Sequence, residues 1–265
     1  MTTDDRTLET AMAALLTTAP ATLAPNILAD VGLADRYARF DSPIGPLVVA
    51  WNGLGVSAVE AAGDDASFEA THRLRTGRPA YRVERLPERL AAAIARRLGG
   101  DRRVRIDLDL RGHTEFERDV WRKALEIPRG EVRPYGWVAA EIGRPRAVRA
   151  VGTALGHNPV PLIVPCHRVV RSDGSIGQYS LGGPANKRTI LAAEGLDPDA
   201  LESAARAGVR YIGSDTTHIV CLPTCHAAKR ITPRHRVPFR SIGSAAAAGY
   251  RTCLECRPSS GAIAA

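Results

Sequence analysis

Cys166 and His167 stand side by side in the stretch Pro165–Arg168, directly after the apolar run Val160–Val164. A cysteine on an apolar strand is usually a buried small hydrophobe, but a neighbouring histidine offers a base for the thiol proton. In an extended strand adjacent side chains point to opposite faces, so this pair needs a bent backbone or an intervening water. We therefore predict a nucleophilic thiol at the end of a short buried strand.

Glu194 is a candidate group to orient the histidine, and a base works best when a third group holds it. It ends the predicted helical stretch Leu191–Glu194, and Gly195 follows as a C-cap residue. A carboxylate at this point can return to His167. The sequence thus predicts a Cys–His–Glu constellation.

The other four cysteines form two pairs, Cys221-x3-Cys225 and Cys253-x2-Cys256. Two such pairs separated by a loop are typical of tetrahedral thiolate ligation of zinc. The segment around them is poor in apolar core, and a metal would stabilise it. We predict a zinc site with four cysteine ligands. The nearby histidines are interpreted as surface residues: His218, His226 and His235.

A small α/β unit precedes these sites. Short strands are predicted at 37–40, 45–51, 55–59 and 104–110, together with a helix over 86–98 that Gly99-Gly100 ends. No cluster of catalytic residue types occurs there, so we interpret the unit as a scaffold. Residues 1–34 are predicted to be a helical extension that packs or binds a partner, since four apolar residues share helical spacing: Leu8, Met12, Leu15 and Leu16.

A helical block follows the α/β unit. Thr114 can cap a first helix, whose apolar face consists of Phe116, Val120, Trp121 and Ala124. A second helix is predicted over 135–142, and a third begins with Pro145 near its first position. Two helices joined by a short glycine-containing turn are typical of a helix-turn-helix.

The third helix has two different faces. At about 100° per residue, Val148, Val151 and Leu155 cluster on one side. The opposite side is small, basic and free of carboxylates: Arg146, Arg149, Ala150 and Thr153. Such a face can lie close to DNA, and a solvated helix face with two arginines is the alternative interpretation.

Composition limits the possible partners. The chain has 265 residues, a net charge of +8 and five cysteines. An odd number of unevenly spaced cysteines argues against a disulfide framework and favours a reducing cytoplasm. No run approaches the roughly 20 apolar residues of a membrane span, and the acidic start lacks a signal-peptide pattern. The segment Val209–Pro258 holds eight basic and two acidic side chains, a weak indication of a polyanionic partner.

The residues around Cys166 resemble the signature of the methylated-DNA–protein-cysteine methyltransferases, the O6-alkylguanine DNA repair proteins. Further landmarks extend the resemblance over 116–195, in order: Phe116–Trp121, Ile127–Val132, Ala147–Gly152, Asn158–Pro161 and Pro165–Val170. The preceding α/β unit is more loosely similar to the ribonuclease-H-like amino-terminal subdomain of that family. The resemblance implies a winged helix-turn-helix alkyltransferase domain.

The resemblance also implies residue roles. Cys166 would accept the alkyl group, with His167 activating it through a water and Glu194 orienting His167. Tyr135 would protonate the departing guanine, and Asn158 would bond near the thiol. Arg149 would enter the duplex where the target base is expelled, and Tyr179 would line the base pocket. Arg146 and Thr153, on the same exposed helix face as Arg149, are expected to contact DNA as well. Expelling the target base costs a few kcal/mol, which an inserted Arg149 would offset in part.

The four-cysteine segment is similar to the amino-terminal zinc domain of the Ada adaptive-response protein, on the stretches 211–221 and 249–258. That family implies that the first ligand, Cys221, accepts a methyl group from DNA methylphosphotriesters. The domain order is reversed here, and Leu222 stands where the family typically has a basic residue. A zinc-stabilised module that binds DNA phosphates without accepting methyl groups is the alternative.

We therefore expect an α/β plus α chain with these parts: a helical extension (1–34), a ribonuclease-H-like subdomain (35–111), a winged-helix methyltransferase domain (112–198), a linker (199–208), an Ada-type zinc domain (209–258) and a tail (259–265). The expected function is stoichiometric direct-reversal repair of O6-methylguanine, and of O4-methylthymine, in double-stranded alkylated DNA. We expect a cytoplasmic, nucleoid-associated monomer with zinc and without an organic cofactor. A non-enzymatic damage sensor, a transcription regulator and a cysteine protease are the weaker alternatives.

Overall fold

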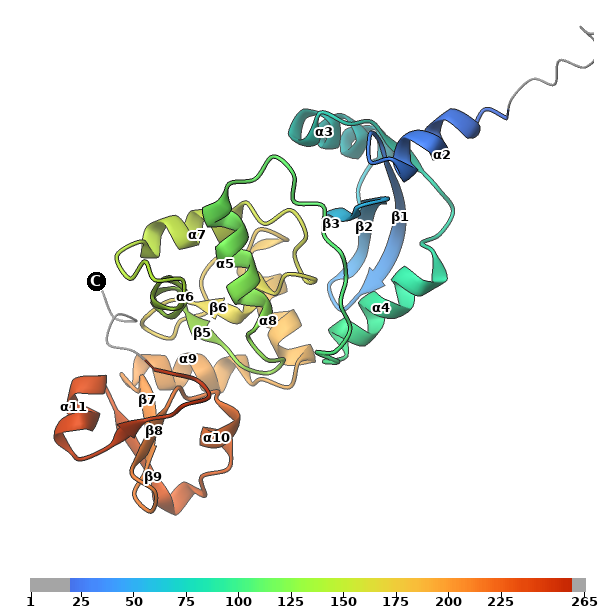
Figure 1. Cartoon of the computed structure of the whole chain (residues 1–265). Helices are drawn as coiled ribbons and strands as arrows, with labels where there is room; N and C mark the ends of the chain where they lie inside the picture. The colour runs from blue at the N-terminus through green and yellow to red at the C-terminus, as the bar shows by residue number, and fades with distance from the viewer. Residues whose placement is uncertain (1–19, 259–265) are drawn as a thin grey trace, which may run out of the picture.

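The computed structural model describes residues 20–258, which form three successive parts (Figure 1). Most of the predicted extension, including Leu8, Met12, Leu15 and Leu16, lies outside the described residues. Within 20–258, no helix is long and apolar enough to cross a membrane.

The amino-terminal part is a four-stranded sheet with helices around it. Its elements are α2 (Leu23–Asp30), β1 (Asp35–Ser42), β2 (Gly45–Asn52), β3 (Gly55–Ala61), α3 (Asp65–Thr76), β4 (Ala80–Arg82) and α4 (Glu88–Leu98). The strand order is β3-β2-β1-β4, with only the β1–β4 pair parallel. The first three predicted strands and the helix are confirmed, because their alternating or periodic apolar residues are buried against one another.

The strand predicted at 104–110 is wrong. Only Leu108 pairs with β3, in an isolated bridge to Val56. The prediction rested on the alternation of apolar residues with Asp107 and Asp109. The Asp109 carboxylate, however, is buried and bonded to Asn52 instead of facing solvent. A side chain that turns inward to a polar partner breaks the regular strand pattern.

A buried polar network fixes the centre of this part. The Asp35 carboxylate is fully buried and accepts hydrogen bonds from Ser57 and Arg78 at 2.6 and 2.8 Å, with the His72 ring nitrogen at 3.0 Å. Burial alone raises the pKa of Asp35, but its bonds with His72 and Arg78 outweigh this and lower it. Since each of these charges has a partner, the network holds the strands and α3 together.

The middle part carries the Cys166 motif. Its elements are α5 (Glu115–Leu125), β5 (Arg133–Pro134), α6 (Tyr135–Glu141), α7 (Val148–Gly156), η1 (Cys166–Arg168), β6 (Val169–Val170) and α8 (Gly183–Ala193). The predicted cap of α5 is confirmed as a capping box: Glu117 N donates to Thr114 Oγ1, and Thr114 N donates to a Glu117 oxygen. Val120 and Trp121 of α5 are fully buried.

The two-faced helix is confirmed, but it begins later than predicted. Pro145 lies in a turn, in which Ala147 N donates to Arg144 O, and α7 starts only at Val148. Val151 is buried against α5 and α6, while Arg149 is exposed on the opposite face.

The strand predicted before Cys166 is wrong as well. Leu162 has a left-handed φ of 72°, which turns the chain, and the only pairing in this run is an isolated bridge between Pro161 and Val164. Cys166 therefore does not end a strand and instead begins the short 3-10 helix η1. This is the bent backbone that a Cys–His pair requires.

The third part is a second small sheet. Its elements are α9 (Pro198–Arg206), β7 (Tyr211–Ser214), β8 (Ile219–Cys221), α10 (His226–Lys229), η2 (Pro233–His235), β9 (Arg236–Phe239), α11 (Ile242–Ala247) and β10 (Arg251–Thr252), in the strand order β10-β8-β7-β9. Helix α9 occupies most of the stretch predicted as a linker and lies between α8 and this sheet (Figure 1). One hydrophobic cluster continues from the middle part into the third.

Candidate functional site

The Cys166 thiol is held at the start of η1, and the residue is 5 % exposed. Burial raises the pKa of this thiol, so at neutral pH it rests protonated. Asn158, two residues beyond α7, donates its amide hydrogens to Cys166 Sγ at 3.1 Å and to Val164 O at 3.0 Å. The amide thus fixes the turn before η1 and offers a hydrogen bond that favours the thiolate.

His167 and Glu194 meet as the sequence predicted. His167 Nε2 lies 3.0 Å from Glu194 Oε1, and the ring is fully buried. Burial raises the pKa of Glu194, yet the bonds with His167 and Arg168 lower it to about 2, so the carboxylate only accepts hydrogen bonds. The Nε2 atom must therefore carry the proton. The buried Nδ1 atom, which has no protein partner within residues 20–258, keeps the basic lone pair.

Arg168 is a member of the site that the sequence reasoning missed. Its guanidinium holds both Glu194 oxygens, with Nη2 to Oε1 at 2.6 Å and Nε to Oε2 at 3.0 Å, and it donates to Ile127 O at 2.7 Å. The sequence did contain a signal for this role of Arg168, because an arginine within the apolar stretch around Cys166 requires a buried partner.

Lys187 is a second missed residue. This side chain on α8 is fully buried, and its Nζ atom donates to Val169 O at 2.6 Å and to Gln178 O at 3.3 Å. Burial lowers the pKa of Lys187 to about 8, and its charge favours ionisation of the Cys166 thiol. A lone lysine in a partly apolar helix gave no clear sequence signal.

Two tyrosines lie near enough to Cys166 for its thiolate charge to raise their pKa: Tyr135 and Tyr179, the latter in the loop before α8. Tyr135 is the first residue of α6; burial and the neighbouring Cys166 raise its pKa. Tyr179 is 8 % exposed, its ring centroid lies 6.1 Å from that of His167, and its hydroxyl has no partner in the described part of the chain. Both phenols therefore stay protonated at neutral pH and can donate hydrogen bonds to a bound molecule.

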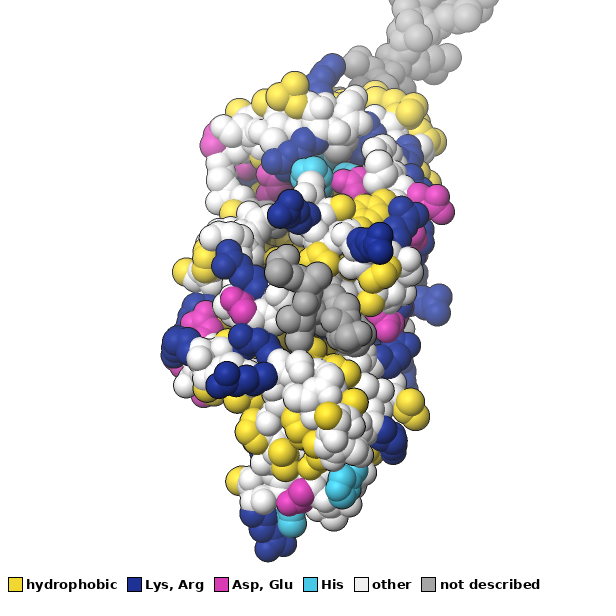
Figure 2. Space-filling model, turned by 90° about the vertical axis from the view of Figure 1, so that its left-hand side faces the viewer, with side chains coloured by type: hydrophobic (Ala, Val, Ile, Leu, Met, Phe, Trp, Pro, Cys, Tyr) yellow, Lys and Arg dark blue, Asp and Glu magenta, His cyan; other side chains and the backbone are white. Residues whose placement is uncertain are grey.

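The basic residues predicted to contact DNA lie apart from this cluster. Arg149 and Thr153 lie on α7, Arg146 lies in the turn before it, and all three residues are exposed. Lys and Arg side chains are spread over the side of the molecule shown in Figure 2. The structure thus separates the buried cluster around Cys166 from the exposed arginines of α7 and of the turn before it.

The four cysteines of the third part form one cluster. The Sγ atoms of Cys221, Cys225, Cys253 and Cys256 lie within 4.8 Å of one another, and all four residues are buried. Tetrahedral ligation at about 2.3 Å places thiolate sulfurs roughly 3.8 Å apart, so the set fits a zinc ion. Leu222 N lies 3.3 Å from Cys256 Sγ and adds a hydrogen bond to a thiolate. The predicted four-cysteine site is confirmed.

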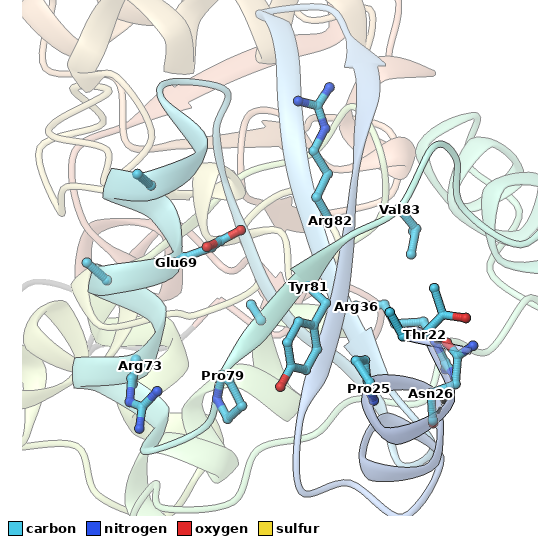
Figure 3. Close-up of a pocket in the computed structure, with 14 residues that line it drawn as sticks. Thr22, Pro25, Asn26, Arg36, Glu69, Arg73, Pro79, Tyr81, Arg82 and Val83 are labelled. Atoms are coloured by element: carbon cyan, nitrogen blue, oxygen red, sulfur yellow. Dashed lines mark hydrogen bonds between the residues drawn. The ribbon is translucent and has the colours of Figure 1, made fainter. Parts of the chain in front are cut away.

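A cavity of about 640 Å³ opens in the amino-terminal part, between α2, α3 and β4. Glu69 and Arg73 come from α3, and Tyr81 and Arg82 from β4 (Figure 3). None of the predicted site residues lines it.

Family models match both the segment that holds Cys166 and the segment that holds the four cysteines. The model of the 6-O-methylguanine DNA methyltransferase DNA binding domain matches residues 115–196, and that of the metal binding domain of Ada matches residues 201–259. The latter match and the four-thiol cluster identify zinc as the metal.

Curated relatives agree with these family models. The methylated-DNA–protein-cysteine methyltransferase of Mycobacterium bovis is 40% identical over 162 residues, which cover 60% of this chain and 92% of the relative. That of Mus musculus is 34% identical over 172 residues, which cover 61% and 82%. The crystal structure of Mycobacterium tuberculosis OGT in complex with DNA is 35% identical, with a TM-score of 0.49 over 60% of this chain and 93% of that chain. The chain belongs to the methylated-DNA–protein-cysteine methyltransferase family and joins its methyltransferase part to an Ada-type zinc domain.

Proposed function

We propose that Cys166 is the acceptor in a direct-reversal repair reaction. The alkyl group on O6 of methylguanine, or on O4 of methylthymine, moves from double-stranded DNA to the Sγ atom. The observation that carries this proposal is the arrangement around one buried thiol: Asn158 donates to Sγ, and Glu194 leaves Nδ1 of His167 as the free basic nitrogen.

The proton and the electron pair can be followed through this arrangement. His167 Nδ1 takes the thiol proton through a water while Sγ attacks the methyl carbon in line. The S–C bond forms, the C–O bond breaks, and the bonding electrons leave with the guanine oxygen. A proton from the Tyr135 hydroxyl neutralises the departing base, and Tyr179 lines the base pocket. The product is a thioether, which no group in the site can cleave, so each protein acts once.

Mass spectrometry tests the proposed acceptor. The intact protein, incubated with duplex DNA that contains O6-methylguanine, should gain the mass of one methyl group per molecule. Peptide mapping should place that methyl group on Cys166. Folded protein with an unchanged mass would contradict the proposal and favour a non-enzymatic damage sensor.

Arg149 gives a prediction for the DNA contact. The Arg149→Ala variant should transfer methyl groups from duplex DNA about 10- to 100-fold more slowly, because no side chain then offsets the few kcal/mol of base expulsion. Transfer from free O6-methylguanine base should change little. Single-turnover rates on the two substrates measure this difference.

Arg89→Ala is the matched control, since Arg89 is an exposed arginine on α4, outside the helix-turn-helix. Its rate on duplex DNA should equal that of the unchanged protein. Equal slowing of both variants would show a general charge effect and contradict the specific role of Arg149.

Cys221 is the second candidate acceptor, for methyl groups on DNA phosphotriesters. The match to the metal binding domain of Ada supports it, as do the metal-ligand cluster and the basic charge of the segment. Cys221 is 1 % exposed and Cys166 is 5 % exposed, so burial does not separate the two candidates. The test is to incubate the Cys166→Ser variant with DNA that carries labelled methyl groups on its phosphotriesters. Label on Cys221 would support methyl acceptance by this cysteine. Absence of label would leave a zinc-stabilised module that only binds DNA.

The same proposal extends to the organisation of the chain. The mixed sheet at 35–111 is assigned as a ribonuclease-H-like subdomain, 112–198 as a winged-helix domain that binds DNA through α7, and 209–258 as the zinc domain, with 199–208 between them. The protein works as a monomer on the DNA of the nucleoid, in the cytoplasm. The +8 net charge supports a polyanionic substrate.

A further inference from the structure

The loop between the first two zinc ligands is packed against the methyltransferase part. Thr224 lies between Cys221 and Cys225 and is 6 % exposed. Its hydroxyl accepts a hydrogen bond from Val132 N at 2.9 Å and donates one to Val132 O at 3.2 Å. The hydroxyl thus satisfies both backbone groups of Val132, immediately before β5.

A second contact begins at Cys225, which caps α10. His226 N donates to Glu131 Oε1 at 3.1 Å, and the other oxygen of Glu131 pairs with Arg133 at 2.5 Å. The Arg133 guanidinium lies 5.5 Å from the centroid of the Trp137 ring. All three methyltransferase side chains are buried, so this ion pair is completed by a backbone group of the zinc domain.

A third contact involves the ligand Cys256 itself. Trp137 Nε1 donates to Cys256 O at 2.8 Å, and the next residue, Arg257, pairs with Glu141 at 2.6 Å. Trp137 and Glu141 belong to α6, the helix whose first residue is Tyr135. The zinc domain therefore holds this helix at two points.

The fourth contact leads toward the reaction centre. Lys229 Nζ, at the end of α10, donates to Gly130 O at 2.8 Å, while Gly130 N lies 3.3 Å from Glu194 Oε2. Gly130 has a φ of 73°, and a Cβ there would lie 3.0 Å from Glu194 O. Lys229 thus bonds to the carbonyl group of Gly130, and Glu194 bonds to its N–H group.

We propose that the zinc domain braces the alkyl-transfer site, with Thr224 and Trp137 as positioning residues for the reaction at Cys166. Two of the metal ligands are part of these contacts with the segment 130–141. Cys225 lies between Thr224 and His226, which both bond to the segment, and Cys256 itself accepts the hydrogen bond from Trp137. That segment carries Tyr135 at its middle and supports Glu194 at its start. Because the metal fixes the spacing of its ligands, its loss frees the segment. The inference rests on the proposed role of Cys166 in transfer.

Zinc removal is the first test. Zinc-loaded full-length protein and protein depleted with a chelator are compared by hydrogen exchange of peptides covering 130–142, and by the single-turnover transfer rate. We expect faster exchange in these peptides and a transfer rate about tenfold lower, since small displacements of reacting groups have effects of this size. The affinity for DNA should change less than the rate.

Two zinc-loaded variants complete the test, because depletion can unfold the domain as a whole. Thr224→Val removes both bonds to Val132, and Trp137→Phe removes the bond to Cys256 O, while the four ligands stay intact. Thr217→Val, in the exposed turn after β7, is the control. The first two should raise exchange over 130–142 and slow transfer with zinc content unchanged, and the control should do neither.

The two proposals fail in different ways. The proposed bracing by the zinc domain would be overturned if Thr224→Val and Trp137→Phe both left the protein unchanged in two measurements. These are hydrogen exchange over 130–142 and the single-turnover transfer rate. If the unchanged protein transfers no alkyl group, the proposed reaction fails, whereas hydrogen exchange still tests the brace.

Discussion

The Cys166→Ser variant should bind duplex DNA that contains O6-methylguanine and transfer almost no methyl group. A hydroxyl is a far weaker nucleophile than a thiol, because its proton is much harder to remove. We expect a rate lower by on the order of 10⁴-fold, as is typical when a covalent nucleophile is lost. The fold should persist, since the substitution is nearly isosteric and Asn158 Nδ2, now 3.1 Å from Sγ, can donate to the new oxygen.

Radiolabelled DNA and peptide mapping measure this loss. The variant should retain the duplex affinity of the unchanged protein, because the exposed face of α7 is untouched. Label found on another cysteine after reaction with O6-methylguanine DNA would show that Cys166 is not the acceptor for this lesion. If the transfer rate were unchanged and the label lay on the introduced serine, the thiol would not be required for the reaction.

The Cys–His–Glu geometry was predictable because its signals are local. Cys166 and His167 are adjacent, and Gly195 marks the helix end at which Glu194 turns back toward them. Gly195 has a φ of 85°, so the C-cap prediction is confirmed in its physical detail. The four-cysteine cluster was predictable for the same reason, since ligand spacing within each pair is encoded in the sequence.

Backbone direction was less predictable. The apolar run before Cys166 has strand-like composition, but the left-handed conformation of Leu162 is set by tertiary packing, with this side chain 5 % exposed in the core. The start of α7 shows the same limitation. Pro145 suits a first helical turn, yet the turn bond from Ala147 N to Arg144 O delays the helix.

The polar partners of Lys187 and Thr224 could not be predicted from the sequence. Lys187 and Thr224 have ordinary sequence surroundings, and only the fold brings them to the carbonyl of Val169 and the backbone of Val132. The stretch 199–208 looked like a linker because it is rich in alanine. Its helix α9 instead lies against α8, so the zinc domain begins next to the methyltransferase part.

Glu194→Gln should give the second large effect, on both stability and transfer. Three donors converge on the two carboxylate oxygens: His167 Nε2, the Arg168 guanidinium and Gly130 N. An amide supplies only one acceptor oxygen and turns an NH2 group toward one of these donors, leaving Arg168 buried without its counter-charge. Breaking a buried pair in this way costs about 3 kcal/mol or more of the free energy of unfolding.

The transfer rate should fall by about 10²-fold in the same variant, since a general base that is no longer oriented loses its contribution. His167 would still be present, but either ring nitrogen could carry the proton, so Nδ1 would no longer be held as the basic atom. Denaturant unfolding and single-turnover assays measure the two effects separately. Glu202→Gln is the control, because its ion pair with Arg188 at 2.8 Å is partly exposed and contributes at most about 1 kcal/mol.

The pH dependence of stability gives Glu194 an independent signature. Its pKa is about 2 in the folded protein and 4.5 as the ordinary value, so the unfolded chain binds the proton more readily. The stability that this carboxylate contributes is therefore complete above pH 4.5 and is lost as the pH falls toward 2. The unchanged protein should lose stability more steeply over this interval than the Glu194→Gln variant. Parallel curves would contradict the paired carboxylate, and with it the assignment of Nδ1 as the base that activates Cys166.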